Sequence, residues 1–236
     1  MSLRVMSYNI LLGGEDRISH ITNVIREQHP DVVALLEANS EENVAALARE
    51  LDMECVFGEA NSEFHVAWLS RLPLLRTENH RLPVLTKTLL EIELQWERRR
   101  VNLFATHLQH GREEECEQKR VEEIHAILDV MSHVDNRPRL LVGDLNALHP
   151  TDYVGAETQT PREAIPLFLA AGYIDCYRRK HPIAAGYTWK LPTLSLRLDY
   201  MFASIEMSLN LHSCDVVSSE EAKIASDHLP IIAEFG

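Results

Sequence analysis

The chain has 236 residues, of which 45% are hydrophobic and 25% are charged, and its formal net charge is −13. This length allows one sizeable hydrophobic core, so we expect a single domain over residues 1–236. The acidic charge argues against a protein that holds nucleic acid mainly by neutralising phosphates. It remains compatible with a nucleic-acid enzyme that recruits metal cations.

The N-terminal segment and the cysteines bear on where the protein acts. Residues 5–14 are short and interrupted by polar side chains, unlike a secretory signal peptide. No apolar run approaches the ~18 residues that a transmembrane segment needs. The cysteines are far apart and form no zinc-type pair, which favours a reduced compartment. We therefore expect a cytoplasmic monomer without a transmembrane segment; the cysteines are Cys55, Cys116, Cys176 and Cys214.

The N-terminal part of the chain reads as alternating strands and helices. Residues 3–11 and 31–37 are apolar runs of strand length that end in polar side chains. Between them, residues 16–30 place three isoleucines at helical spacing and close with a proline, which predicts a helix. Residues 39–51 predict a second helix, because Asn39 stands three residues before a glutamate, the spacing of a capping box.

The middle of the chain favours antiparallel strands. Residues 64–75 predict a strand that stops at Pro73. Residues 89–110 predict two strands joined by a charged turn, which is the pattern of a hairpin. An amphipathic helix is predicted over 113–134, and 139–147 return to a strand that ends in polar residues.

The last part of the chain supplies one helix and the remaining strands. A helix start is predicted at Thr160, Pro161 and Glu163, with proline at the first helical position. Strands are predicted within 187–204 and 226–235. Hairpins imply antiparallel pairing and helices imply covered sheet faces. The pattern therefore predicts an α/β (α+β) fold of two packed mixed β-sheets with helices outside.

Polar side chains stand at the ends of the predicted strands. One buried polar group often does no more than satisfy the backbone. Several carboxylates buried near one another are costly unless a cation or hydrogen bonds compensate. The glycine before Asp144 would let backbone and substrate approach closely. The polar residues at these ends are Asn9, Glu37, His107, Asp144 with Asn146, Asp199, and Asp227 with His228.

The residue types at these ends suit the hydrolysis of a phosphoester. Carboxylate and amide oxygens, here from Glu37, Asn9 and Asp227, are the ligands that Mg²⁺ or Mn²⁺ prefer. Histidines can donate to phosphate oxygens or transfer protons near neutral pH. Attack of water on a phosphoester needs charge neutralisation, a positioned water and donors to the phosphoryl oxygens.

Six short segments carry a resemblance to a known family. SYN, LLE, THL, GDLNA, RLDYMF and SDHLP occur in this order between Ser7 and Pro230. They resemble the motif series of the endonuclease/exonuclease/phosphatase superfamily, the deoxyribonuclease-like metal-dependent phosphoesterases. The resemblance implies a four-layer α/β/β/α sandwich. It also implies Mg²⁺-dependent hydrolysis of a phosphodiester or phosphomonoester by an activated water.

The resemblance also implies a role for each motif residue. Glu37 would be the main magnesium ligand, assisted by Asn9 and Asp227. The other roles are a water-orienting Asp144, a phosphate-binding Asn146, His228 paired with Asp199 to stabilise developing charge, and His107 as a donor to a phosphate oxygen. The identity of the general base and the number of metal ions stay open.

Two positions depart from patterns within the family, and the first of them bears on the branch of the superfamily that the chain resembles. The THL segment has His107 where abasic-site endonucleases usually have tyrosine, so the chain looks more like the deoxyribonuclease, sphingomyelinase and related phosphodiesterase branches. Leu36 stands where many members have glutamine. The substrate stays open between nucleic acid, nucleotide, inositol phosphate and lipid phosphodiester, and a nuclease acting on DNA or RNA is the alternative.

Other interpretations of the same residues are weaker. His107 and His110 are three apart, but a strand is predicted there and no third histidine follows closely, which disfavours zinc. A serine hydrolase lacks its GxSxG elbow, so Ser226 is expected to be structural. Trp189 is expected to pack, and the basic segment 177–180 to be solvated rather than to touch phosphates. A non-catalytic phosphate-binding protein with the same fold is a further alternative.

Overall fold

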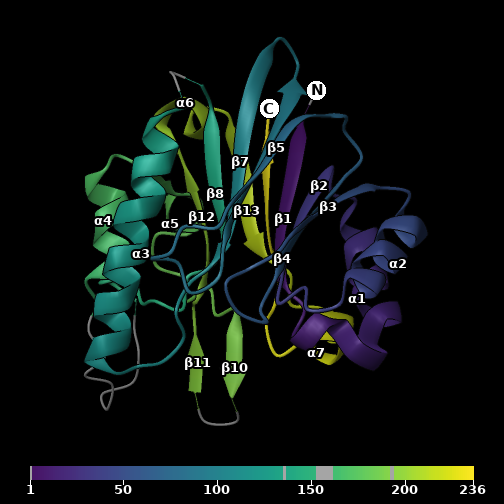
Figure 1. The fold of residues 1–236 in the computed structure, drawn as a ribbon, viewed down its shortest axis with the longest axis horizontal. Coiled ribbons are helices and arrows are strands. Elements are labelled where there is room, and N and C mark those ends of the chain that lie inside the picture. The colour runs from purple at the N-terminus through teal and green to yellow at the C-terminus, as the bar shows by residue number, and fades with distance from the viewer. Residues whose placement is uncertain (1, 135–136, 153–161, 192–193) are drawn as a thin grey trace.

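The computed structural model describes residues 2–134, 137–152, 162–191 and 194–236. Two six-stranded β-sheets pack against each other, and helices cover both outer sides (Figure 1). This arrangement is the predicted four-layer α/β/β/α sandwich with mixed sheets.

The first sheet carries both chain termini. Its strands are β1 (Leu3–Asn9), β2 (Val32–Leu36), β3 (Glu54–Gly58), β4 (Val66–Ser70), β13 (Leu211–Val216) and β14 (Ile231–Phe235). Their order in the sheet is β13-β14-β1-β2-β4-β3. Strands β1 and β2 run parallel, and the other neighbours run antiparallel.

The second sheet is built around the predicted hairpin. Its strands are β5 (Leu74–His80), β6 (Leu89–Trp96), β7 (Arg99–His107), β8 (Arg139–Asp144), β9 (Ile174–Asp175) and β12 (Asp199–Ala203). Their order is β5-β6-β7-β8-β12-β9, with β7 and β8 parallel. A separate small hairpin pairs β10 (Trp189–Leu191) with β11 (Leu194–Leu196).

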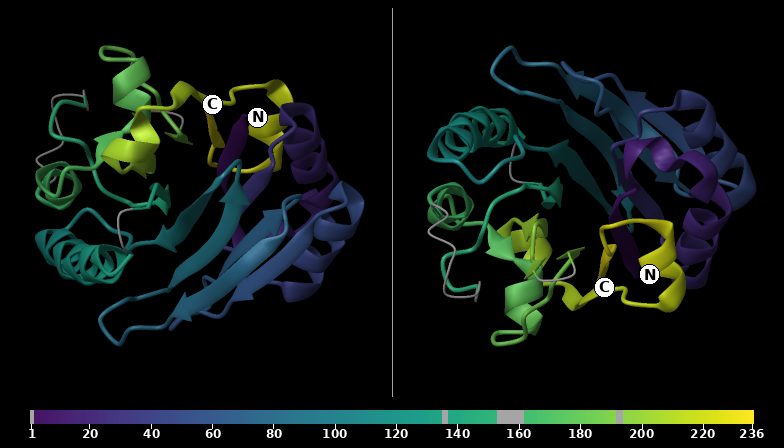
Figure 2. Two further views of the ribbon diagram at one scale, coloured as in Figure 1. Left: turned by 90° about the horizontal axis from the view of Figure 1, so that it is seen from above. Right: turned by 90° about the horizontal axis from the view of Figure 1, so that it is seen from below.

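The helices form the two outer layers, seen end-on in Figure 2. Helices α1 (Ile18–Gln28), α2 (Glu41–Leu51) and α7 (Glu220–Ala225) cover the first sheet, and α3 (Glu114–Ser132) and α4 (Ala164–Ala170) cover the second. The remaining described helical segments are α5 (Cys176–Lys180), α6 (Ile205–Ser208) and the 3-10 segment η1 (Leu12–Arg17). None of the described helices has the length and apolar character that a membrane crossing requires.

The alternation of side chains along each strand explains the layers. In β8, Leu140 and Val142 face the core between the two sheets, whereas Leu141 faces the core beneath α3 and α4. In β2, Ala34 faces the central core and Leu35 faces the core beneath the helices of the first sheet. Because successive strand residues point to opposite faces, a strand covered on both faces is apolar throughout.

Some predicted boundaries move by a few residues. Ser40, rather than Asn39, caps α2, because its Oγ accepts from the backbone N of Asn43 at 3.2 Å. Pro73 stands between β4 and β5 instead of ending a strand. The described helix near the predicted start at 160–163 begins at Ala164; Thr160 and Pro161 lie outside the described residues.

Candidate active site

The ends of three neighbouring strands place the predicted catalytic residues side by side. Asp144 ends β8 and is paired in register with His107, which ends the parallel strand β7. On its other side, Asp144 is paired with Asp199, which begins the antiparallel strand β12. From the first sheet, Asn9 ends β1 opposite Leu36 of β2, so Glu37 follows at the same edge.

Asp144 lies at the centre of these residues. Its Oδ2 accepts from Asn9 Nδ2 at 3.1 Å and lies 3.6 Å from the Nε2 atoms of both His107 and His228. Its Oδ1 accepts from the backbone N of Asn146 at 3.0 Å. Burial raises the pKa of the Asp144 carboxyl to about 7. This carboxylate therefore connects both sheets and both histidines.

The two histidines lie in different electrostatic surroundings. The Nδ1 atom of His228 lies 2.8 Å from Asp199 Oδ2. Burial opposes the protonation of His228, but the charges of Asp199 and Asp144 outweigh it and raise its pKa to about 10. Burial, assisted by the charge of Lys87, lowers the pKa of His107 well below the usual value. One histidine is thus favoured as the cation and the other as the neutral ring.

Glu37 and Asn9 form the half of the site that the first sheet supplies. Asn9 Nδ2 donates to Glu37 Oε1 at 3.1 Å, and the backbone N of Leu12 donates to Glu37 Oε2 at 3.0 Å. Asn9 Oδ1 accepts from the backbone N of Leu11 at 3.0 Å. Glu37 has a left-handed backbone with φ of 54°, an uncommon conformation that recurs at functional sites.

The segment before His228 is tied to β1 and presents Asp227 to solvent. Ser226 Oγ donates to the backbone O of Asn9 at 2.7 Å and accepts from the backbone N of His228 at 3.2 Å. Ser226 therefore connects two parts of the site, in line with the structural role expected for it. Asp227 is exposed, and its Oδ2 accepts from Trp189 Nε1 at 3.2 Å.

A pocket of about 430 Å³ opens over this cluster. Asn9 and Asp199 lie behind its wall, and both are 1% exposed. Much of the remaining wall is apolar, including Leu12, Phe64 and Trp189. The predicted site residues that line the pocket are Glu37, His107, Asp144, Asn146, Asp227 and His228.

The charges around the pocket suit a hard divalent cation. In the described part of the chain, no lysine or arginine forms an ion pair with the carboxylates of Glu37, Asp144, Asp199 and Asp227; Asp144 and Asp199 pair with histidine alone. Asp144, Asp199 and His228 have ligand-type atoms within 4.8 Å of one another. However, His228 turns a different ring nitrogen to each carboxylate, which favours a hydrogen-bonded relay over ligation of one ion. The remaining oxygen donors are Glu37, the Asn9 amide hydrogen-bonded to it, and Asp227, and oxygen donors fit Mg²⁺ or Mn²⁺ better than a soft metal.

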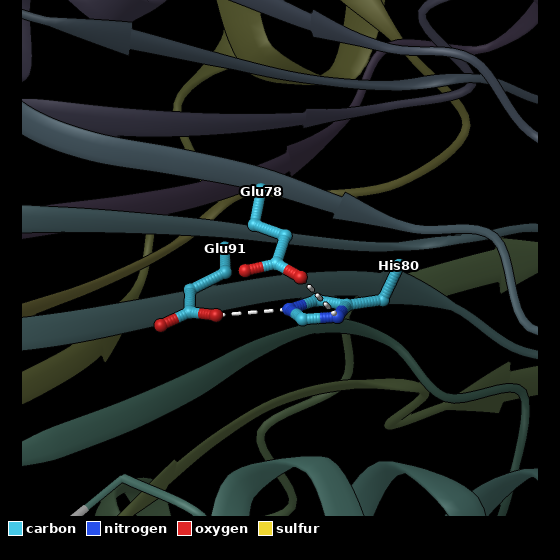
Figure 3. A group of neighbouring side chains, drawn as sticks. All are labelled: Glu78, His80 and Glu91. Atoms are coloured by element: carbon cyan, nitrogen blue, oxygen red, sulfur yellow. Dashed lines mark hydrogen bonds and ion pairs between the residues drawn. The ribbon is translucent and has the colours of Figure 1, made fainter.

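A second group of ligand-type side chains lies on β5 and β6 (Figure 3). Its members, Glu78, His80 and Glu91, are not among the residues that line the pocket. His80 Nε2 lies 2.8 Å from Glu91 Oε2, and His80 Nδ1 lies 3.6 Å from Glu78 Oε1. Arg76 forms ion pairs with both glutamates. Because His80 separates the two carboxylates and Arg76 offsets their charge, this group is an ion-pair network.

Three residues of the pocket wall are not among the predicted site residues. His110 and Arg112 line the pocket, although the sequence suggests only a disfavoured zinc site for His110 and no role for Arg112. Trp189 packs as expected, against a small cluster of leucines, but it also lines the pocket, and its ring centroid lies 5.8 Å from the guanidinium carbon of Arg112. His110 and Arg112 closely follow the THL segment, and this position is the signal in the sequence that could have identified them. The basic segment 177–180 is not part of this wall.

The sequence and the structure both resemble known proteins. A family model described as Endonuclease/Exonuclease/phosphatase family matches residues 6–228. The structure is similar to a 3′ phosphatase from Neisseria bound to a product DNA hairpin, with a TM-score of 0.82, 21% identity and 99% of each chain covered. It is also similar to an AP endonuclease from Archaeoglobus fulgidus, with a TM-score of 0.82, 19% identity and 99% of each chain covered.

A third similar structure is an endonuclease/exonuclease/phosphatase from Beutenbergia cavernae. Its TM-score is 0.80 at 24% identity, over 99% of this chain and 71% of that one. Among curated proteins, none matches the chain in sequence. At these identities the three structures establish the shared fold, and the family rests on the match over residues 6–228.

Proposed function

Since this chain belongs to the Endonuclease/Exonuclease/phosphatase family, we propose that it is a Mg²⁺-dependent hydrolase that cleaves a phosphodiester or phosphomonoester bond by attack of an activated water. Members of this family are phosphoester hydrolases and nucleases. The observation that carries the proposal is Asp144, a buried carboxylate that lies within 3.6 Å of two histidines and accepts from Asn9. We further propose that it acts as a single-domain monomer in the cytoplasm, where its four free cysteines would stay reduced.

Glu37, Asp227 and Asn9 would hold the metal ion. Glu37 and Asp227 both line the pocket. Among the described residues, no lysine or arginine forms an ion pair with either carboxylate. Asn9 would offer Oδ1, which now accepts from Leu11 N, and so would exchange one partner for another. When bound, Mg²⁺, or Mn²⁺ in its place, would neutralise charge on the phosphoryl oxygens.

Asp144 is the group best placed to orient or deprotonate the attacking water. Asp144 lines the pocket, and its Oδ2 lies 3.6 Å from Nε2 of each histidine. Burial raises its pKa to about 7, so it can accept a proton at Oδ2 near neutral pH. Asn146 follows with a left-handed backbone, φ of 50°, and its Nδ2 donates to Leu108 O at 3.2 Å. That amide would turn from Leu108 to the scissile phosphate.

His228 and His107 would contact the phosphoryl oxygens from two sides. His228, held as the cation by Asp199, would present its Nε2 proton to the charge that develops on the phosphate. His107 would donate one hydrogen bond as a neutral ring. Because both rings are nearly buried, the water around them is restricted and these bonds are strengthened.

A nuclease is the second candidate, and one observation favours it. The Arg112 guanidinium lies over the Trp189 ring at the pocket rim, 5.8 Å from its centroid. An aromatic face beside a cation is the combination that contacts a base and its backbone in single-stranded nucleic acid. The net charge of −13 favours a small or locally bound substrate over processive binding to long duplex.

A Mg²⁺-supplemented activity screen tests the proposal. Its substrates would be DNA, RNA, nucleotide, inositol phosphate and sphingomyelin, and Asp144→Ala and His228→Ala are the inactive controls. We expect turnover that chelation with EDTA abolishes and that both variants lose. Absence of metal-dependent turnover on every substrate, together with phosphate binding by calorimetry, would replace the proposal with a non-catalytic phosphate-binding protein.

A further inference from the structure

The loop of residues 108–112 leaves β7 directly after His107 and forms one rim of the pocket. Its first residue is fixed to the catalytic strand, because Leu108 N donates to the backbone O of Asp144 at 3.0 Å. Leu108 O accepts from Lys87 Nζ at 2.9 Å and from Asn146 Nδ2 at 3.2 Å. The start of the loop is thus held by neighbours of the phosphate site.

Arg120 of α3 holds the rest of the loop from beneath. Its side chain is 0% exposed, and its Nη1 donates to Gln109 O at 2.8 Å and to Gly111 O at 2.9 Å. Its Nε donates to Glu117 Oε2 at 2.9 Å. The other oxygen of Glu117 accepts from the backbone N of Ala164 at 2.8 Å, at the start of α4. The planar guanidinium allows one side chain to bind two carbonyls and a carboxylate together.

Glu123, on the next turn of α3, binds the backbone of the same loop residue, Gln109. It is also 0% exposed, and its Oε2 accepts from Gln109 N at 2.9 Å. Its Oε1 accepts from Thr86 N at 2.8 Å and from Thr86 Oγ1 at 2.6 Å. Residue Gln109 therefore has its N–H bound by a buried anion and its C=O bound by a buried cation. Burying such charges is costly unless partners compensate, and here three of the compensating hydrogen bonds are made to the backbone of this loop.

The rim that this loop presents is basic in an acidic chain. His110 and Arg112 are exposed and line the pocket. Among the described residues that line it, Arg112 is the sole arginine or lysine. The net charge of the chain is −13, so these side chains are the ones placed to attract an anionic substrate at this rim.

We propose that Arg120, assisted by Glu123, is a positioning residue that sets the 108–112 loop so that His110 and Arg112 bind the part of the substrate beyond the scissile phosphate. The inference rests on the proposed phosphoesterase function. Arg120 does not touch the pocket; it acts through the backbone of Gln109 and Gly111. Its loss should therefore weaken substrate binding more than it slows the chemical step, because the residues of β7, β8 and β12 stay in place.

Kinetics of Arg120→Met and Arg120→Lys test the kinetic part of the inference, with single-stranded oligodeoxynucleotide and bis(4-nitrophenyl) phosphate as the probes. For substrates that wild type turns over, we expect KM to rise about tenfold in Arg120→Met with kcat within about twofold, since a small misplacement of binding groups is costly. Arg120→Lys should recover part of the loss by retaining one carbonyl bond. A fall in kcat that follows the folded fraction, with KM unchanged, would overturn the positioning role.

Hydrogen exchange tests the loop itself and needs no turnover. Exchange of the 108–112 amides should accelerate at least about tenfold in Arg120→Met, because opening becomes easier once the bonds are lost, while β7 stays protected. Unchanged exchange there would overturn the inference even in an active enzyme. Conversely, the wild type could turn over no phosphoester while Arg120→Met still accelerates exchange of the 108–112 amides. That outcome would refute the proposed function alone.

Arg71→Met is the matched control variant. Arg71 also holds two carbonyls, donating from Nη1 to Leu51 O at 2.6 Å and from Nε to Pro30 O at 3.3 Å. It is not among the residues that line the active-site pocket. We expect Arg71→Met to lower the melting temperature while KM and the exchange of the 108–112 loop stay at wild-type values.

Discussion

The Nδ1 atom of His228 lies 2.8 Å from Asp199 Oδ2, and both residues are 5% exposed or less. The other ring nitrogen of His228 then faces Asp144 Oδ2 at 3.6 Å. Because the two ring nitrogens of His228 face different carboxylates, the plane of its imidazole ring is fixed. Since Asp199 and Asp144 are also paired in register across β12 and β8, backbone pairing and the side-chain relay reinforce each other.

Asp199→Asn should leave the fold intact and slow catalysis. The amide keeps an acceptor for His228 Nδ1 but removes the negative charge, so the pKa of His228 should fall and its cationic form should be less populated. We expect kcat for phosphoester hydrolysis to fall about 10²-fold with little change in KM. Initial rates with Mg²⁺ measure this, and circular dichroism checks the fold.

Asp215→Asn is the matched control for that change. Asp215 pairs with His181 at 2.8 Å, in a similar aspartate–histidine contact outside the active-site pocket. Its loss should leave kcat at the wild-type value. Equal losses in the two variants would show that the effect of Asp199 is not specific to the relay.

Glu37→Gln should weaken binding of the divalent cation. The variant keeps the shape of the side chain and can still accept from Leu12 N, but it loses the charge that faces the pocket. We expect the dissociation constant for Mg²⁺ in isothermal titration calorimetry to rise at least about tenfold. Mg²⁺ should also raise the melting temperature of the wild type more than that of the variant.

Glu78→Gln tests whether the cation binds at the strand-end pocket or at the group of Glu78, His80 and Glu91. Glu78 belongs to the network with His80 and Arg76 on the second sheet. If the metal binds at the strand-end pocket, this variant keeps the wild-type affinity for Mg²⁺. A loss of affinity in Glu78→Gln and not in Glu37→Gln would move the cation to β5 and β6.

The layers of the fold were predictable because binary patterning depends on local sequence. A run such as Leu140–Val142 is apolar on both faces, and the structure covers it on both sides. The order of strands in each sheet was not accessible, because it depends on which segments distant in sequence pair. The predicted N-cap of α2, Asn39, is wrong by one residue. Both Asn39 and Ser40 are good capping residues, and only the path of the chain into the helix selects Ser40.

The candidate site residues could be selected from the sequence because they are polar groups at positions where a strand should be apolar. Asp144, Asp199 and His228 meet as the ordered motifs implied. The role of Arg120 in holding the 108–112 loop could not be predicted from the sequence. An arginine on an amphipathic helix can be buried or exposed, and only the fold shows that Arg120 is buried. The same limit applied to Trp189, whose ring is partly packed and partly exposed to the pocket.

Gly143→Ala should destabilise the protein strongly. Gly143 of β8 lies opposite Thr106 of β7 with φ of 154°, and a Cβ there would lie 1.9 Å from Thr106 O. The close approach at this glycine is thus to the neighbouring backbone. We expect a loss of about 3 kcal/mol or more in the free energy of unfolding, measured by urea denaturation, because the parallel pair would have to separate.

Gly172→Ala is the control that separates crowding from backbone conformation. Gly172 has φ of 85°, but no heavy atom lies within 4 Å of the position of its Cβ. The left-handed conformation alone should cost about 1 kcal/mol. If Gly143→Ala were no more destabilising than Gly172→Ala, the strands β7 and β8 would have to be farther apart than the structure has them.

Glu91→Gln should remove part of the pH dependence of stability. Burial raises the pKa of the Glu91 carboxyl, but the hydrogen bonds from His80 and Asn102 outweigh it, so the pKa lies below 4.5. Because the folded pKa is the lower one, the unfolded chain binds more protons between the two values. The stabilisation by Glu91 is then complete above about pH 4.5 and disappears as the pH falls through the folded pKa.

Urea unfolding across this pH range measures the effect. Glu91→Gln should be less stable than the wild type at about pH 7, and the two should converge as the wild-type carboxyl is protonated. The exposed Glu50, which lies 3.9 Å from Arg26, supplies the control Glu50→Gln, whose stability should follow the wild type at every pH. A gap between Glu91→Gln and the wild type that stays constant down to about pH 3 would contradict the role of the charge, because it would show that the lost hydrogen-bond geometry alone destabilises the variant.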